Sequence, residues 1–254
     1  MSEVLNIQNI SKKYQAKNGE IVAIRDLSFS VYGGDYLSIV GPSGCGKSTL
    51  LSIIAGLTKA SGGRIALYNE NLTGISPYIG YMLQRDNLLP WRSIFKNIIL
   101  GLEIRAMVSN ETLKYASDLI KTYGLWDFKD KYPSQLSGGM RQRAALIRTL
   151  CIKPKILLLD EAFSALDYQT RLRVTDDVWQ ILKNENMTTI MVTHDIPEAV
   201  SMSNRVLIMT ERPASVKKII ELDFGADMTP LERRDDPRFR IYFNRIWKEL
   251  DKNV

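Results

Sequence analysis

Short stretches in the first third of the chain alternate apolar with polar residues, which is the two-residue period of a half-buried strand. They are residues 4–7, 9–10, 21–24 and 27–31. The turn-forming pairs Asn18-Gly19 and Gly33-Gly34 stand beside them. We predict that this part of the chain forms an antiparallel β-sheet.

A glycine-rich loop separates the next predicted strand from the first predicted helix. The strand covers residues 36–40, and the helix covers residues 47–57, where apolar side chains recur at three- and four-residue spacing. From about residue 86 to 150 the pattern becomes helical, with Ser109 or Asn110 placed to cap one of the helices.

Beyond residue 150 strand and helix patterns follow one another. An apolar run at residues 156–159, a helix near residues 171–183 and a strand at residues 189–193 have the rhythm of a buried parallel sheet. We therefore expect an α/β architecture in which the helical segment, about residues 86–150, is inserted between two strands of the core.

The chain is expected to end in an amphipathic helix. Asp236-Pro237 is a good cap and first-turn pair, and apolar residues then fall on one face: Phe239, Phe243, Ile246, Trp247 and Leu250. This face either packs on the chain's own domain or binds a membrane surface or a partner. We expect residues 1–230 to form one domain and residues 231–254 a C-terminal helical extension.

The composition is that of a globular chain, with 254 residues that are 45% hydrophobic and 24% charged. The net charge is +6, but basic residues come in pairs such as Lys12-Lys13 and not in blocks, so no nucleic-acid partner is expected. Two cysteines are too few for a disulfide framework, and no targeting segment is evident. Apolar runs fall far short of the ~18 residues of a membrane span. We expect a cytoplasmic chain that reaches a membrane through a partner.

Residues 41–48 carry the strongest chemical signal. They fit G-x-x-x-x-G-K-[ST] between a predicted strand and a predicted helix, the context that this phosphate-binding loop requires. Main-chain N–H groups turn inward on a polyphosphate, Lys47 reaches the β- and γ-phosphates, and Ser48 offers a hydroxyl to Mg²⁺. A dinucleotide-binding fingerprint fits less well, because Thr49 stands where its third glycine would be.

Two carboxylates and the only histidine follow the buried strands. Asp160 and Glu161 are adjacent and point in different directions, so one can hold Mg²⁺ and the other can polarise an attacking water. His194 follows the strand at residues 189–193, at the edge where parallel sheets place ligand-binding loops. Taken alone, each feature has a plainer interpretation: solvated acids at a strand end, and a structural histidine.

A second helix start lies at residues 136–143, within the helical segment. Ser137 as an ordinary N-cap is the simple interpretation. Gly138 and Gly139 go beyond what a cap needs, and they indicate another helix end that approaches a phosphate closely.

In this order along nearly the whole chain, the motifs resemble those of the ATP-binding subunit of ABC transporters. The matching parts are the Walker A loop (Gly41, Pro42, Ser43, Gly44, Cys45, Gly46, Lys47, Ser48 and Thr49), the Q-loop glutamine (Gln84), the signature (Ser137, Gly138 and Gly139), Walker B with its catalytic glutamate (Asp160 and Glu161), the D-loop (residues 164–167), the switch histidine (His194) and the adenine-stacking aromatic (Tyr14).

The resemblance implies an α/β P-loop ATPase core with an N-terminal antiparallel β subdomain and an inserted α-helical subdomain. It implies ATP and Mg²⁺ as cofactors, and two subunits that face each other head to tail so that the signature of one completes the ATP site of the other. The implied catalytic residues are Glu161, His194 and Gln84. The implied metal-binding residues are Ser48, Gln84 and Asp160. Nucleotide binding falls to Tyr14, the Walker A loop and the signature.

The family also implies transmembrane permease subunits as partners and a place at the cytoplasmic face of the membrane. Residues 160–164 and 88–92 resemble the nitrate, sulfonate and taurine branch of bacterial importers, which use an extracellular substrate-binding protein. Trp91 either buries against a permease helix or packs on its own helical subdomain. The alternatives are a non-transport ABC ATPase of the translation or DNA-repair type, which usually has two cassettes or a coiled coil, and a P-loop kinase, which would lack the signature.

Overall fold

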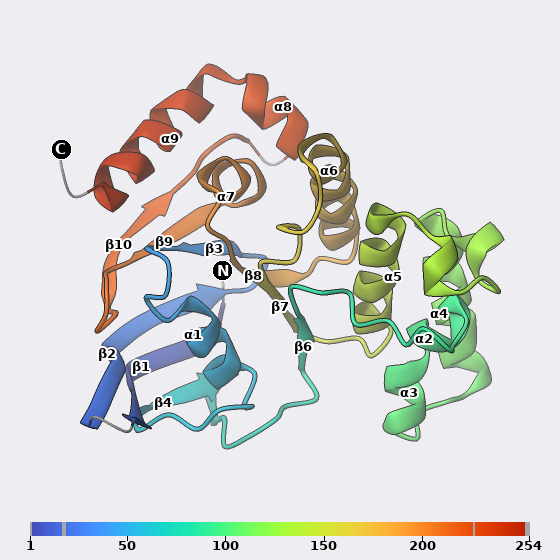
Figure 1. Cartoon of the computed structure of the whole chain (residues 1–254), viewed down its shortest axis with the longest axis horizontal. Coiled ribbons are helices and arrows are strands. Elements are labelled where there is room, and N and C mark those ends of the chain that lie inside the picture. Colours follow the sequence, from blue (N-terminus) through green and yellow to red (C-terminus); the bar gives the residue numbers. More distant parts are fainter. Residues whose placement is uncertain (1, 17–18, 226, 252–254) are drawn as a thin grey trace.

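The computed structural model describes residues 2–16, 19–225 and 227–251, so the turn expected at Asn18 lies partly outside the described residues. Two β-sheets form the body of the molecule, with helices between and around them (Figure 1). The N-terminal sheet is antiparallel with the order β2-β1-β4-β5. Its strands are β1 (Glu3–Ala16), β2 (Gly19–Tyr32), β4 (Gly62–Leu67) and β5 (Glu70–Asn71).

The central sheet has the order β10-β9-β3-β8-β7-β6, and its strands are parallel except for β10. They are β3 (Tyr36–Val40), β6 (Ile79–Met82), β7 (Ile156–Asp160), β8 (Thr188–Val192), β9 (Arg205–Met209) and β10 (Val216–Glu221). In β7, Ile156 and Leu158 pack in one hydrophobic core while Leu157 and Leu159 pack in another. Both faces of the sheet are therefore buried, which explains the unbroken apolar run.

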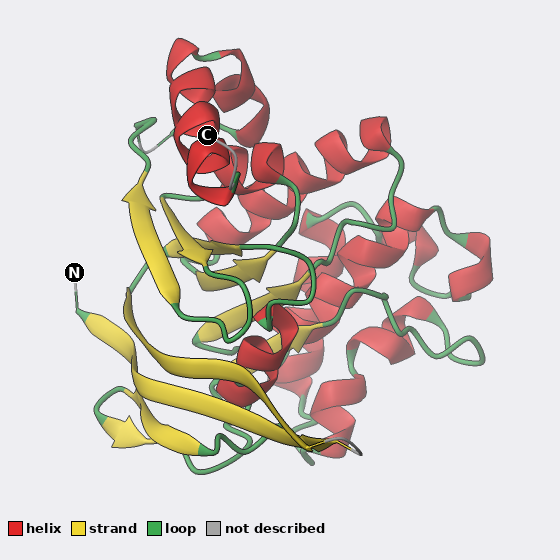
Figure 2. Cartoon of the chain, turned by 60° about the vertical axis from the view of Figure 1, so that its left-hand side comes forward, coloured by secondary structure: helices red, strands yellow, loops and turns green. Residues whose placement is uncertain are grey.

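Helices cover both faces of the central sheet. On one side, α1 (Lys47–Ile54) shares a hydrophobic core with the N-terminal sheet, and on the other side α5 (Gly138–Leu150) and α6 (Tyr168–Asn184) belong to a second core. Figure 2 shows the helices packed around the strands. The first helix ends three residues before the predicted end. Gly56 has φ 74°, and a Cβ there would lie 2.1 Å from the Gly74 carbonyl oxygen, so this close contact stops the helix.

A helical segment joins β6 to β7 and extends away from the N-terminal sheet (Figure 1). It contains α2 (Ile94–Ile98), α3 (Leu100–Ile104), α4 (Asn110–Thr122), two 3₁₀ turns (Trp126–Phe128 and Pro133–Gln135) and α5. Ser109, and not Asn110, caps α4, and it shares a capping box with Thr112. The expected α/β class with an antiparallel β subdomain and an inserted helical subdomain is confirmed.

The C-terminal part folds back on the central sheet. It consists of α7 (Ile196–Met202), β9, β10, α8 (Pro230–Asp235) and α9 (Pro237–Leu250). Asp236 caps α9 as predicted, and Ile246 is fully buried against α7 and β9, so the apolar face packs on its own chain. Trp247 departs from that prediction, because it is half exposed and stacks on Phe243. The division at residue 230 stays a prediction. In the described part of the chain, no helix has the length and apolar character to cross a lipid bilayer.

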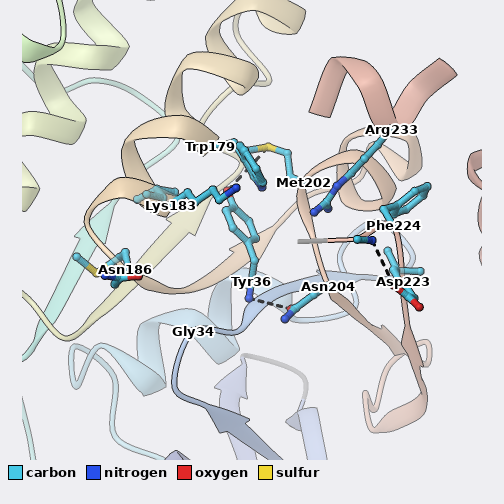
Figure 3. Close-up of a pocket in the computed structure, with 14 residues that line it drawn as sticks. Gly34, Tyr36, Trp179, Lys183, Asn186, Met202, Asn204, Asp223, Phe224 and Arg233 are labelled. Carbon is cyan, nitrogen blue, oxygen red and sulfur yellow. Dashed lines mark hydrogen bonds between the residues drawn. The ribbon is translucent and has the colours of Figure 1, made fainter. Parts of the chain in front are cut away.

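A cavity of about 370 Å³ lies where α8 meets the core (Figure 3). It opens at the amino end of β3, whereas the glycine-rich loop follows the carboxyl end. The Arg233 guanidinium donates to the carbonyls of Ser201 and Ser203 and lies over the rings of Trp179 and Phe224. This arginine therefore ties α8 to the body of the domain.

Helix α7 carries a buried carboxyl group. Glu198 is 4% exposed, and burial raises its pKa to about 7. A glutamate in an unfolded chain has a pKa of ~4.3. Between this pH and about pH 7, Glu198 is therefore protonated in the folded state and ionised in the unfolded state. The free energy of unfolding therefore falls as pH rises through this window and stays at the lower level above it.

Glu198→Gln is expected to raise the free energy of unfolding at pH 8 by at most about 4 kcal/mol, and to change it little at pH 4.5. The amide stays neutral, so it avoids the desolvation that the carboxylate suffers at high pH. Urea unfolding at the two pH values checks this prediction. An equal shift at both values would mean that the carboxylate's ionisation is not the cause.

Candidate functional site

The glycine-rich loop connects β3 to α1. Gly44 and Gly46 have φ of 69° and 125°, a conformation that other residues rarely adopt. Lys47 is 6% exposed, and its Nζ donates to the carbonyl oxygens of Gly41 and Pro42, both at 2.9 Å. The ammonium group thus lies folded along the loop. Cys45 contributes only its main chain, because its thiol is buried in the core and burial raises the thiol pKa.

A cavity of about 570 Å³ opens over this loop. Loop residues between Ser43 and Thr49 form its floor, and Glu161, His194 and Arg212 complete the wall. The side chains come from the ends of β3, β7, β8 and β9, which lie at the same edge of the parallel sheet. This is the edge where open α/β sheets bind ligands.

Ser48 and Asp160 meet beside the cavity, although 112 positions separate them in the chain. The Ser48 hydroxyl donates to Asp160 Oδ1 at 2.9 Å, and the Tyr81 hydroxyl donates to Asp160 Oδ2 at 3.0 Å. Burial, followed by the charge of Asp160, raises the pKa of Tyr81 well above its usual value, so the phenol stays protonated. A hydroxyl and a carboxylate are oxygen ligands of the kind that Mg²⁺ takes beside nucleotide phosphates, and the pair fits this ion.

Glu161 adopts a strained backbone conformation with φ 47°. Its N–H donates to the Val192 carbonyl at 2.9 Å, which holds the turn against β8. Its Oε2 lies 3.2 Å from His194 Nδ1. The strain turns the chain directly after Asp160 and brings the two predicted catalytic side chains together at the cavity.

Gln84 contacts the other side of this turn. Its Nε2 donates to Ser164 Oγ at 3.0 Å, and Ser164 Oγ donates to the Glu161 carbonyl at 2.9 Å. The predicted Q-loop glutamine is therefore linked to Glu161 through one serine. The predicted metal role would place the Gln84 side chain beside Ser48 and Asp160. In the structure it donates its hydrogen bond to Ser164.

Among the described residues, those lining the cavity do not include the predicted signature or Tyr14. Ser137 is exposed and caps α5 by accepting from the Met140 N–H at 3.3 Å. A Cβ on Gly139 would lie 2.7 Å from Val174 Cγ2, so close packing against α6 also requires this glycine. Tyr14 is 41% exposed on β1, with Lys12 Nζ 4.9 Å from its ring centre.

Two residues of this region, Tyr81 and Arg212, were not predicted from the sequence. Arg212 lies in the turn after β9, and its Nη2 donates to the Gly44 carbonyl at 2.6 Å. A signal for it existed, because it closely follows a parallel strand at the ligand-binding edge. Tyr81 lies within a strand, where an aromatic residue normally indicates packing alone.

Comparison with known proteins agrees with this geometry. The sequence model of the ABC transporter family matches residues 24–164. An uncharacterised ABC transporter ATP-binding protein of Bacillus subtilis, YtlC, is 44% identical over 97% of this chain and 95% of its own length. The nitrate transport protein NasD of Klebsiella oxytoca is 37% identical over 94% and 93%, and the nitrate import ATP-binding protein NrtD of Synechocystis is 35% identical over 95% and 93%.

A solved structure agrees as well. The dimeric ATP-binding cassette MJ0796, in a post-hydrolysis state bound to ADP and Pi, superposes with a TM-score of 0.73 at 29% identity, and the match covers 87% of this chain and all of that one. The family match spans more than half of the chain, and several relatives are more than one third identical to it over nearly its whole length. The chain therefore belongs to the ABC transporter family, as one of its ATP-hydrolysing cassettes.

Proposed function

We propose that this ABC ATPase drives a bacterial importer for a small anion or related solute of the nitrate, sulfonate or taurine type. The convergence of Lys47, Glu161 and His194 on one cavity, with the signature outside it, supports the ATP-hydrolysing part of this proposal. Support for the cargo class comes from the relatives, of which NasD is a nitrate transport protein and NrtD a nitrate import ATP-binding protein. No observation favours a translation or DNA-repair role.

In the proposed mechanism the triphosphate of ATP lies along the loop at the start of α1. Lys47 Nζ exchanges the carbonyls of Gly41 and Pro42 for oxygens of the β- and γ-phosphates. Ser48 and Asp160 would hold Mg²⁺, which when bound would neutralise negative charge on those phosphates.

Glu161 accepts a hydrogen bond from the attacking water and orients it. His194 donates to the terminal phosphate from the ring nitrogen that faces away from Glu161. Gln84 is linked to this turn through Ser164, and in the proposal it couples the turn to the segment that leads from β6 into the helical subdomain. Hydrogen bonds between Glu161 and His194 and between Gln84 and Ser164 hold these side chains in place, which reduces reorganisation during the reaction.

A second copy of the chain completes the site in this proposal. Ser137 is exposed at the start of α5 and belongs to a surface apart from the cavity within one protomer. In a head-to-tail dimer the signature of one protomer faces the phosphates held by the other, and contacts made only in the closed state favour closure on ATP. The dimeric solved relatives support this arrangement.

The proposed permease contact lies on the helical subdomain. Leu88 is buried within it and anchors the segment, while Trp91 is 72% exposed beside it. An exposed tryptophan on an anchored loop is suited to bury against a partner helix. The proposal places the ATPase at the cytoplasmic face of the membrane, attached to permease subunits that work with an extracellular substrate-binding protein.

Uptake measurements test the proposed function. Cells of the source organism that carry Glu161→Gln in this gene are expected to lose uptake of one labelled solute among nitrate, taurine and alkanesulfonates, while cells with the surface change Glu20→Gln retain it. Unchanged uptake of all three solutes in the Glu161→Gln cells would exclude the proposed cargo class.

A further inference from the structure

Tyr81 occupies an unusual position next to the Ser48–Asp160 pair. The side chain of Asp160 has two oxygens, and the structure gives each a hydroxyl donor: Ser48 at 2.9 Å on Oδ1 and Tyr81 at 3.0 Å on Oδ2. The carboxylate is therefore held from both sides, and its rotation about the Cβ–Cγ bond would break both hydrogen bonds.

The phenol ring is itself fixed in place. Tyr81 lies on β6, which pairs in parallel with β7, and its Cα partner there is Leu158. The ring is half-buried and packs against the hydrophobic core between the two sheets. Because strand pairing and packing set the ring position, the hydroxyl is a rigid donor, in contrast to a water molecule or a flexible surface side chain.

We propose that Tyr81 is a positioning residue for the metal site: its hydroxyl holds Asp160 in the orientation in which Oδ1 and the Ser48 hydroxyl face the metal together. The inference rests on the proposed role of Ser48 and Asp160 toward Mg²⁺. Carboxylates that bind metals are commonly held by such a second hydrogen bond, and losing it typically weakens metal affinity by about 10- to 100-fold.

The substitution Tyr81→Phe removes the hydroxyl alone and leaves the packed ring. Mn²⁺ is the probe, because its binding in the presence of saturating ADP can be followed by electron paramagnetic resonance without turnover. We expect Tyr81→Phe to raise the dissociation constant of Mn²⁺ about tenfold, and to leave the affinity for ADP in EDTA within about twofold of the wild type.

The matched control is Tyr78→Phe. Tyr78 lies three residues earlier, is 50% exposed, and loses the same atom at a distance from Asp160. It is expected to bind Mn²⁺ as the wild type does. In steady-state hydrolysis, Tyr81→Phe should require about tenfold more Mg²⁺ for half-maximal rate, with the maximal rate recovered when Mg²⁺ is raised. A purely structural role would lower the maximal rate and the melting temperature instead.

Two results would overturn the inference. One is an unchanged Mn²⁺ dissociation constant in Tyr81→Phe. The other is an equal loss of Mn²⁺ binding and of metal-free ADP binding, because the hydroxyl would then act on the loop or the fold. Neither result would affect the proposed function, provided that the wild type binds and hydrolyses ATP. The proposed function itself would be contradicted if Lys47→Ala left nucleotide binding unchanged.

Discussion

Glu161→Gln is expected to lower ATP turnover by about 10²- to 10⁴-fold while ATP binding persists. The amide has the size of the carboxylate and can still contact His194, so the cavity keeps its shape. It is a much weaker base, and an attacking water is no longer oriented and polarised by a negative charge. With hydrolysis slowed, the ATP-bound dimer should accumulate.

Turnover is measured by phosphate release, and dimer formation by size-exclusion chromatography with and without ATP. Glu20→Gln is the matched control, because Glu20 pairs with Lys13 on the surface, and it should hydrolyse ATP as the wild type does. Turnover at the wild-type rate in Glu161→Gln would remove Glu161 from its proposed role.

Lys47→Ala is expected to weaken ATP binding by about 10- to 100-fold. Hydrogen bonds to a charged group contribute about 1.5–3 kcal/mol each, and ~1.4 kcal/mol corresponds to a factor of ten in affinity. Two carbonyls hold the ammonium group at the loop, so it lies beside the proposed phosphate position and exchanges these hydrogen bonds for phosphate oxygens when ATP binds.

Fluorescence titration with an ATP analogue measures this effect. Lys96→Ala on α2 removes an exposed lysine of the same charge and should leave the affinity unchanged. Because Lys47 is buried, the melting temperature of the variant is recorded alongside. An ATP affinity equal to that of the wild type in a folded Lys47→Ala protein would contradict the proposed phosphate contact.

The buried strands were predictable from sequence because their pattern depends on burial alone. The run at residues 156–159 appears in the structure as β7, with side chains alternating between two cores. β1 was less predictable, since it is one strand of 14 residues where the sequence indicates two short pieces. Asn9 has φ 50°, and shifts in register around it interrupt the alternation without ending the strand.

Helix boundaries depended on contacts that the local pattern does not contain. α1 ends early because the Gly74 backbone lies against Gly56. α8 lies within the predicted helical extension but was not predicted as a separate helix, because six residues are too few for a helical period to be recognised. A local signal was present, however, since Thr229 and Glu232 form a capping box around Pro230.

The candidate site also contains residues that the sequence predicts and residues that only the three-dimensional contacts reveal. The glycine-rich loop is contiguous in sequence, and its spacing with Lys47 was enough to predict the phosphate-binding geometry. Tyr81 and Arg212 reach the site through strand pairing and a turn after β9, which single-sequence periodicity does not specify. Their contribution became visible only with the three-dimensional contacts to Asp160 and Gly44.

The rate of ATP hydrolysis per chain, measured over a wide range of protein concentration, tests the shared site most directly. If Ser137 of one protomer completes the cavity of another, the rate per chain should fall steeply on dilution and reach a plateau at high concentration. A rate per chain that stays constant down to concentrations at which the protein is monomeric would contradict the account.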